Sequence, residues 1–467
     1  MSRDTASLSA LAIADGVRSG ALCATDIVEA SLARIAARPE LGAFTDVVAE
    51  RARARAARID AEVEAGVDHG PLAGVPFAVK NLFDVAGLPT RAGSRIERDA
   101  APAAADPPLV ARLEAAGAIL VGALNMGEYA YDFTGENVHD GPSRNPHALD
   151  HMTGGSSGGS GAAVAGGLVP IALGSDTNGS IRVPSALCGT FGLKPTYGRL
   201  PRNGSFPFVA SLDHLGPFAR SVADLAEAYD AMQGHDAGDP VCVERPLEPT
   251  APLLGGGAAG LRIAIGGGYF ARGGDPAAFA AVARAAEALG ARDTLSIAHV
   301  EAARAAAYVI TMQEGAALHL ERLRTRAADF DPAVRVRLMA GAMLPGAWAA
   351  KAQKLRRLFA AEFARVFETH DALLLPATPC RAPRIGQETM VLDGVEMLVR
   401  PNLGLFTQPI SFVGLPTVVV PVFEAGERLP LGVQIVAAPW REDVCLRIAA
   451  ALEAAGVASA PVGEARP

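Results

Sequence analysis

Hydrophobic and polar positions follow two different periods along this chain, and the period changes near residue 70. Within residues 6–65 the apolar positions recur at helical spacing, and they predict a helix that begins at Thr25 and runs through Ile35. A second helix, rich in Ala and in charged residues, is predicted over Val47 to Glu64. We expect residues 1–65 to form a helical arm that faces solvent.

Beyond residue 70 the pattern becomes the alternation of a strand. Val75, Phe77 and Val79 alternate with other residues, and Lys80 follows directly. A lysine at the end of a strand can simply extend into solvent. It can also be held among apolar neighbours, and burial then lowers the pKa of its amine. The pattern continues with a helix predicted over residues 109–117 and a strand over residues 118–121.

Two Gly- and Ser-rich stretches lie close together in the middle of the chain. Residues 154–160 read GGSSGGS, which predicts a loop, and residues 174–180 form a second polar turn. A helix start at 161–165 and a strand at 169–173 separate them, which is enough chain to place the two loops side by side. Glycine costs roughly 0.5–1 kcal/mol against Ala in regular structure. We therefore expect something to approach the backbone closely here, and a reacting acyl group is the best candidate.

Length and charge limit the class of protein. Alternating strands and helices indicate an α/β fold, and 467 residues suffice for one large domain or two or three ordinary ones. The formal charge is −8 and no basic stripe dominates, which argues against nucleic-acid binding. No apolar run approaches about 18 residues, and the N-terminus lacks an apolar signal core. We expect a cytoplasmic protein without a membrane span.

Cysteine and lysine usage adds two further points. The five cysteines are scattered and show no Cys-x-x-Cys or Cys/His metal spacing, which indicates reduced thiols. Of the 42 basic residues, four are lysines: Lys80, Lys194, Lys351 and Lys354. Arg stays protonated at any ordinary pH, whereas a buried lysine can give up its proton and act as a base. The scarcity of lysine therefore favours a buried, functional amine at Lys80.

Other candidate chemistry is weaker. His139, His147 and His151 lie close together, but no carboxylate or Cys pattern supports them as ligands, and we expect no metal. Glu128 and Asp132 are interpreted as loop or capping residues rather than catalytic carboxylates. The P-loop, Ser-x-x-Lys and His-Glu-x-x-His patterns do not occur in the sequence.

The main alternative concerns Ser156. Residues 154–158 match Gly-x-Ser-x-Gly, the nucleophile elbow of α/β-hydrolases. That motif should follow a strand, whereas residues 145–153 are polar and loop-like. It also needs an Asp and then a His downstream, and Asp213 and His214 are adjacent in sequence and cannot both serve easily.

Three segments together resemble the amidase signature family. They are PLAGVPFAVKNLFD around Lys80, GGSSGGS around Ser156, and GSDTNGSIRVPSALCG, in which Ser180 stands 24 residues after Ser156. The resemblance continues through GLKPTYGR, SLDHLGPFARSVADLA, LLLPATP, FVGLPTVVVP and PLGVQIVAAP, and it covers most of residues 70–445.

The resemblance implies an amidase-signature fold, a single α/β domain over residues 1–467. Its large mixed sheet, mostly parallel, would carry helices on both faces. The parts would be the helical arm (1–65), a signature core with the catalytic residues (70–220), a helical portion (221–375) and the C-terminal part of the core (376–467).

The same resemblance implies a Ser-cisSer-Lys triad that works without metal or organic cofactor. Ser180 would be the nucleophile, and Ser156 would bridge it to the neutral amine of Lys80, so that an acyl-enzyme forms. An oxyanion hole would consist of the backbone N–H groups of Thr177, Asn178, Gly179 and Ser180. Family positions that support the loops are matched by Gly155, Ser157, Asp176 and Arg182.

Two features concern substrate contacts. Asn178 stands where the family more commonly has Gly, so its side chain either accompanies a left-handed turn, which Asn tolerates well, or reaches into the pocket. An Arg cluster lies at residues 322–337, and one member could pair with a substrate carboxylate. We expect Arg322 or Arg324 in that role and the others on a solvated helix face.

Within the family, the chain resembles two groups, and we favour the first. The segments NLFDVAG, FPFVASLDHLGPFARSV, TQPISF and VQIVAAPWRED resemble the carboxybiuret hydrolases of cyanuric acid breakdown. This implies a small, linear, carboxylated ureido substrate, release of ammonia, and a small helical accessory subunit resembling the amidotransferase C subunit. The segments KPTYGRLPR and AQKLRRLF resemble the catalytic chain of the tRNA-dependent amidotransferase. Three alternative functions stay open: a glutaminase of that type, another small-amide amidase, and a catalytically silent binding protein. The chain could also form a homo-oligomer.

Overall fold

The fold is built on one long sheet. The structure, a computed structural model, describes residues 5–465. Its 11-stranded sheet has the order β1-β3-β2-β6-β8-β7-β14-β15-β11-β9-β10. These strands are β1 (Phe44–Val47), β2 (Pro76–Lys80), β3 (Ile119–Leu124), β6 (Ile171–Asp176), β7 (Phe191–Lys194), β8 (His214–Ala219), β9 (Ile263–Gly266), β10 (Asp293–Leu295), β11 (Ala372–Pro376), β14 (Thr417–Val422) and β15 (Leu431–Ala437).

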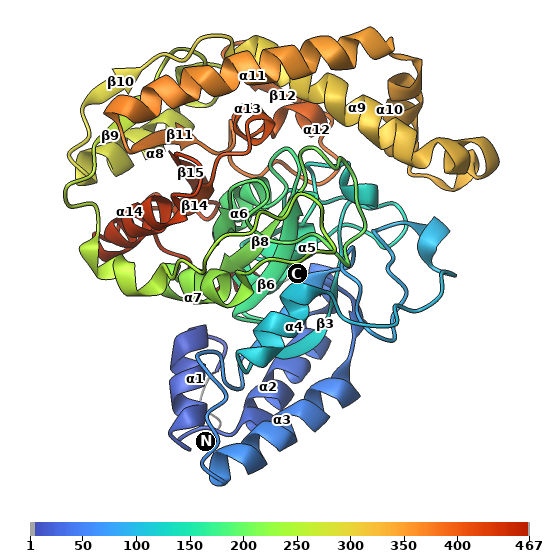
Figure 1. The fold of residues 1–467 in the computed structure, drawn as a ribbon, viewed down its shortest axis with the longest axis vertical. Helices are drawn as coiled ribbons and strands as arrows, with labels where there is room; N and C mark the ends of the chain where they lie inside the picture. Colours follow the sequence, from blue (N-terminus) through green and yellow to red (C-terminus); the bar gives the residue numbers. More distant parts are fainter. Residues whose placement is uncertain (1–4, 466–467) are drawn as a thin grey trace.

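Two small hairpins lie outside this sheet. They consist of β4 (Arg144–Asn145) with β5 (Ala148–Met152), and of β12 (Thr389–Leu392) with β13 (Val395–Leu398). The α-helices are α1 (Ala10–Arg18), α2 (Ala24–Ala37), α3 (Ala49–Glu64), α4 (Pro108–Ala115), α5 (Gly158–Ala165), α6 (Arg182–Cys188), α7 (Val222–Met232), α8 (Pro276–Ala288), α9 (Val300–Thr325), α10 (Pro332–Met343), α11 (Gly346–Thr369), α12 (Val399–Asn402), α13 (Gln408–Phe412) and α14 (Glu442–Ala454). Figure 1 shows α1 to α3 at one end of the molecule and α9 to α11 at the other.

The sheet is mixed, as expected, but the expectation of a mostly parallel sheet is wrong. Among the ten neighbouring pairs in the described sheet, four are parallel and six are antiparallel. Parallel neighbours require a crossover connection, whereas antiparallel neighbours can be joined by a turn or a loop. β14 and β15 are joined by residues 423–430, and β7 and β8 by residues 195–213, without a helix in either connection.

Helices cover both faces of the sheet. Every residue is buried in β2, β3, β6, β8, β14 and β15. Because successive side chains in a strand point to opposite faces, complete burial means that both faces are covered. No helix in the described range 5–465 is both long and apolar enough to cross a membrane.

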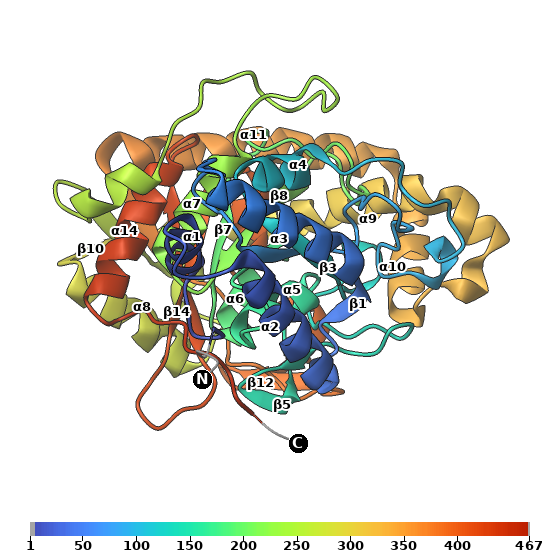
Figure 2. The same cartoon turned by 90° about the horizontal axis from the view of Figure 1, so that it is seen from below.

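The N-terminal region differs from the predicted solvent-facing arm. Its predicted helices are confirmed as α2 and α3, and Figure 2 shows α1 to α3 lying together on one side of the molecule. Ile13, Ile27 and Ile59 are buried in the same hydrophobic cluster as the sheet, and β1 pairs with β3 at the edge. The apolar stripe of each helix therefore packs on the core instead of facing solvent.

The Gly-rich segment also differs from the expected loop. Helix α5 already begins at Gly158, and β6 extends to Asp176, so the second turn is shorter than predicted. A Cβ atom at Gly159 would lie 2.5 Å from the carbonyl oxygen of Asn125 and 2.6 Å from that of Ala43. This glycine is required because the protein's own backbone approaches the helix, not because a substrate does.

Candidate active site

The site begins with Lys80, the last residue of β2. Its side chain is fully buried, and Nζ donates hydrogen bonds to Ser156 Oγ at 2.6 Å and to Ser175 Oγ at 2.8 Å. β2 and β6 are parallel neighbours, with Val79 opposite Leu173, so their carboxyl ends meet at the same edge of the sheet. This register brings Ser175 to the amine.

Burial changes the chemistry of this amine. It lowers the pKa of Lys80 from 10.5 to about 7, although the carboxylates of Asp176, Asp213 and Asp132 oppose the shift. A large fraction of the amine is therefore uncharged near neutral pH, and an uncharged amine can accept a proton. The structure thus supports the buried interpretation of Lys80 over extension into solvent.

The segment that carries Ser156 is held from several sides. The Gly155–Ser156 peptide bond is cis, as the resemblance implies. The amide of Gly155 donates to the carbonyl oxygen of Phe133 at 2.9 Å. The hydroxyl of Ser157 lies 3.3 Å from the amide of Ser175, which donates to it, and 3.2 Å from the carbonyl oxygen of Ser175. Ser156 is thereby fixed against the end of β6.

The turn between β6 and α6 carries Ser180 and is braced by a buried ion pair. Arg182 Nε lies 2.9 Å from Asp176 Oδ2, and both side chains are fully buried. Burial alone would raise the pKa of Asp176, but the charge of Arg182 outweighs it and holds this pKa well below its usual range. Asp176 also accepts from the amide of Ile181 at 3.2 Å, and Arg182 donates to the carbonyl oxygen of Thr407 at 3.0 Å.

Gly179 is the residue of this turn that must be glycine. It has a φ of 138°, and a Cβ atom there would lie 2.1 Å from Thr407 Oγ1. Thr407 Oγ1 in turn donates to the carbonyl oxygen of Asn178 at 2.7 Å. Among the described residues, none accepts a hydrogen bond from the amides of residues 177–180. An oxyanion hole at these amides stays a prediction: Thr177, Asn178 and Ser180 line the cavity at this turn, and Gly179 is not among its lining residues.

Ser180 faces a small, largely enclosed cavity of about 20 Å³. Its wall includes Asn178, Tyr131 and Arg337. The side chain of Asn178 reaches into this wall, where it donates to Thr311 Oγ1 at 2.9 Å, so the pocket interpretation holds and the left-handed one does not. A larger cavity of about 330 Å³ adjoins it, and Ser175 lies in its wall.

The two arginines predicted to bind substrate lie elsewhere. Arg322 pairs with Glu97 at 2.8 Å and lies over the ring of Phe206, and Arg324 is exposed beside Glu321. The member of the cluster that lines the Ser180 cavity is Arg337. The spacing of apolar residues along α10 could have identified Arg337 from the sequence.

Arg337 stands between two buried apolar positions of α10, three residues after Val334 and one before Leu338, and therefore shares the buried face of the helix. Ser175, by contrast, has no sequence signal of its own, because only the pairing of β2 with β6 brings it to Lys80.

The remaining candidates have structural roles. Asp132 accepts hydrogen bonds from the amides of Thr134 and Gly135 and pairs with Arg400, as expected for a loop residue. The nucleophile-elbow alternative, which needs a His and an Asp beside Ser156, is not supported. Ser156 Oγ is hydrogen-bonded to Lys80 instead, and Asp213 accepts from Thr177 Oγ1 at 2.6 Å.

The three histidines considered as ligands have separate partners. His139 contacts the carboxylate of Glu128, His147 contacts the carbonyl oxygen of Cys188, and His151 contacts the carboxylate of Asp150.

Comparison with known proteins shows the family to which the chain belongs. Residues 26–446 match the Amidase family, which is most of the chain, and the protein therefore belongs to the amidase signature family. The resemblance on which the sequence prediction depended is confirmed.

Two curated relatives and one solved structure show where in the family the chain falls. It is 51% identical to AtzE, a 1-carboxybiuret hydrolase subunit of Pseudomonas sp. (strain ADP), over 96% of this chain and 98% of that protein. It is 39% identical to the A chain of the glutamyl-tRNA(Gln) amidotransferase of Anaeromyxobacter sp. (strain K), over 94% of each. A solved structure described as an unexpected vestigial protein complex, from work on the origins of an s-triazine catabolic enzyme, superposes with a TM-score of 0.96 at 50% identity and covers 97% of this chain and 99% of its own.

Proposed function

We propose that the protein hydrolyses a C–N amide bond through an acyl-enzyme on Ser180. The observation that carries the proposal is the buried amine of Lys80, 2.6 Å from Ser156 Oγ, with a pKa of about 7. A serine hydroxyl is a weak nucleophile and needs a nearby base. An uncharged lysine that is connected to a second serine supplies one.

The reaction runs in two stages. As Ser180 Oγ attacks the amide carbonyl carbon, its proton passes to Ser156, whose own proton passes to the Lys80 amine. The amides of residues 177–180 stabilise the oxyanion, and each such donor is worth about 2.7–4 kcal/mol. The proton then returns to the leaving nitrogen, ammonia departs, and water hydrolyses the acyl-enzyme by the same route.

The substrate is a small, linear ureido compound with a carboxylate, and 1-carboxybiuret is the leading candidate. Arg337 lies in the wall of the cavity at Ser180, and its guanidinium can pair with a carboxylate, while the adjoining cavity of about 330 Å³ has the volume for a small linear compound. The 51% identity to a component of a 1-carboxybiuret hydrolase points the same way. We assign the carboxylate contact to Arg337, in place of Arg322 or Arg324.

We also propose that the protein functions together with a partner subunit. Its relative AtzE is described as a subunit, and the solved structure at 50% identity is described as a complex. We propose a small helical accessory subunit that resembles the amidotransferase C subunit. All five cysteines are free thiols, which fits a reducing, cytoplasmic location.

A second candidate is a glutaminase component of an amidotransferase that acts on aminoacyl-tRNA. The 39% identity over 94% of the chain to the corresponding amidotransferase chain supports it. The two candidates differ in substrate and in the need for partners. A glutaminase component would release ammonia from glutamine only with its partner subunits, and would pass it to charged tRNA.

Ammonia release from a substrate panel tests the assignment. The panel consists of 1-carboxybiuret, biuret, allophanate, malonamide and glutamine, each with and without a candidate helical partner. We expect the highest kcat/KM for 1-carboxybiuret and a rise in its KM of roughly 10- to 100-fold in Arg337→Ala, the worth of one charged hydrogen bond. Preference for glutamine would favour the amidotransferase candidate, and no ammonia from any compound would indicate a silent binding protein.

A further inference from the structure

The turn at residues 128–131, which borders the Ser180 cavity, has an unfavourable backbone conformation. Tyr129 and Ala130 have φ values of 48° and 60°, in the left-handed region that residues with a Cβ atom avoid. Ala130 and Tyr131 both line the cavity. Two consecutive residues in this conformation persist only where the surroundings hold them there.

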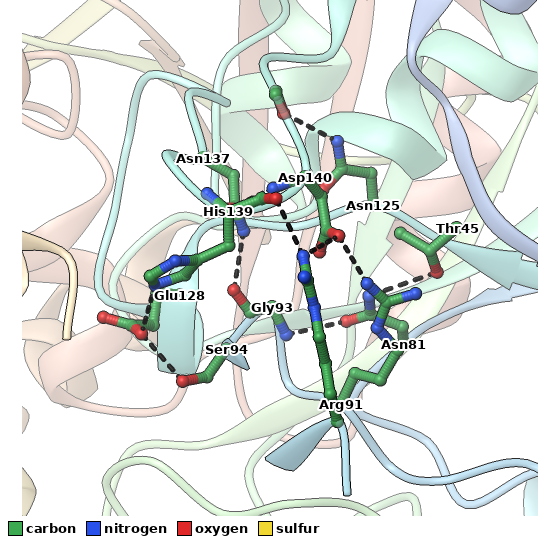
Figure 3. A network of polar contacts seen from close by, with 12 residues as sticks. Thr45, Asn81, Arg91, Gly93, Ser94, Asn125, Glu128, Asn137, His139 and Asp140 are labelled. Atoms are coloured by element: carbon green, nitrogen blue, oxygen red, sulfur yellow. Dashed lines mark hydrogen bonds and ion pairs between the residues drawn. The ribbon is translucent and has the colours of Figure 1, made fainter. Parts of the chain in front are cut away.

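The residue that anchors this turn is Glu128. Its carboxylate is fully buried and accepts three hydrogen bonds from three separate segments. Oε1 accepts from Ser94 Oγ at 2.8 Å and contacts His139 Nε2 at 2.8 Å, and Oε2 accepts from the amide of Asp331 at 2.7 Å. Figure 3 shows Ser94 and His139 converging on this carboxylate.

The partners of Glu128 are themselves fixed. The amide of His139 donates to Asn137 Oδ1 at 2.7 Å, and Asn137 Nδ2 donates to the carbonyl oxygens of Gly93 and Met126 at 2.7 Å each. Gly93 precedes Ser94, so both side chains that hold Glu128 belong to one connected network (Figure 3). The carboxylate therefore has a defined position.

The third bond connects this network to helix α10. Asp331 is the N-cap of α10, and its side chain accepts from the amide of Ala333 at 2.8 Å. Two turns further along the same helix, the guanidinium of Arg337 donates to the carbonyl oxygen of Tyr131 and lies 4.0 Å from the centroid of the Tyr131 ring. The turn at residues 128–131 thus holds α10 at its start and at Arg337.

We infer that Glu128 is a positioning residue for substrate recognition: through the N-terminus of α10 it sets the place of Arg337, and it holds Tyr131 against that guanidinium. The inference rests on the proposed function, because Arg337 is the proposed contact for the substrate carboxylate. Glu128 itself touches neither Lys80 nor the two serines, so we expect its effect on substrate binding; because the amide of the preceding Gly127 donates to the carbonyl oxygen of Ser156 at 3.1 Å, the reactivity of Ser180 is measured as well.

A double-mutant cycle tests this inference. Glu128→Gln keeps the size of the side chain but turns one acceptor into a donor, which either opposes the amide of Asp331 or forces Ser94 and His139, which now donate to the carboxylate, to accept instead. With 1-carboxybiuret we expect KM to rise by about tenfold, with kcat changed far less. Added to Arg337→Ala, the same change should have no further effect on KM, because its route to the substrate is already removed.

Two readouts separate positioning from a general structural role. The rate at which a neutral fluorophosphonate labels Ser180 should stay at the parent value in Glu128→Gln. The matched control is Asp224→Asn, which alters another buried carboxylate that accepts from helix amides, those of Ala10 and Leu11 at the start of α1, outside the site. It should leave KM unchanged. Ser94→Ala, which removes one donor, gives a milder variant if Glu128→Gln folds poorly, and its KM should rise less.

The outcomes distinguish the two proposals. Any one of four results would overturn the inference about Glu128 while leaving the proposed function intact. They are additive effects of Glu128→Gln and Arg337→Ala on KM, a loss confined to kcat in Glu128→Gln, slower labelling of Ser180 in that variant, and an equal rise of KM in Asp224→Asn. An unchanged KM in Arg337→Ala would instead contradict the assigned carboxylate contact, and the positioning role with it.

Discussion

Two lysines of this protein share an unusual environment but differ in what they touch. Lys80 and Lys194 are both fully buried, and burial lowers the pKa of each to about 7. Lys80 donates to two serine hydroxyls, whereas Lys194 donates to the carbonyl oxygen of Pro195 at 3.0 Å. A lowered pKa is therefore not sufficient for a catalytic role. The hydroxyl partners separate the two, and this makes Lys194 a matched control.

Replacing the two lysines should give opposite results for activity. Lys80→Met removes the base, and we expect kcat/KM to fall by about 100- to 10,000-fold. Lys194→Met should retain most of the activity and the parent pH profile. In both the parent and Lys194→Met, the rate should fall as pH decreases through about 7, since protonation of Lys80 removes the acceptor. Steady-state ammonia release between pH 5 and 9 measures this, and a flat profile would count against Lys80.

The same amine makes stability depend on pH. Between about pH 7 and 10.5 the unfolded chain keeps a proton on Lys80 that the native state has released. The free energy of unfolding of the parent should therefore rise with pH across this window, relative to that of Lys80→Met, by about 1.4 kcal/mol per pH unit. Urea denaturation of both proteins at several pH values gives the difference. Parallel curves for the two proteins would mean that the amine keeps an ordinary pKa.

At the scale of elements, the site is assembled where strands end and helices begin. Lys80 ends β2, Asp176 ends β6, and Arg182 begins α6. Helix α5 lies so close to the segments that carry Ala43 and Asn125 that a side chain at Gly159 has no room. Tight packing of α5 holds Ser156 in place against Lys80.

Two glycine substitutions test this packing. Gly159→Ala improves helix propensity, but its Cβ atom would lie 2.5 Å from the carbonyl oxygen of Asn125, so we expect the free energy of unfolding to fall by roughly 1–3 kcal/mol. Gly346→Ala at the start of α11 meets open space and should raise it by up to about 1 kcal/mol. Thermal unfolding compares the two variants. Equal shifts in Tm would show that close approach does not explain Gly159.

At the scale of the whole molecule, sequence patterns predicted the elements better than their arrangement. The motifs identified Lys80, Ser156 and Ser180, and the structure places Ser156 beside Lys80 and Ser180 at a cavity. Strand directions were mispredicted, because a pattern of strands and helices does not record which neighbours are joined by turns. Ser175 depends on the register of β2 against β6, and no single segment contains that information.

The central claim is that Ser180 is the nucleophile and that Lys80 activates it through Ser156. Its most direct test is the rate of covalent labelling by a fluorophosphonate as a function of pH, with the labelled peptide identified by mass spectrometry. The account predicts a single label on Ser180, at a rate that rises as pH increases through about 7 and is lost in Lys80→Met. A label on Ser156, or an equal rate at pH 5 and pH 9, would contradict it.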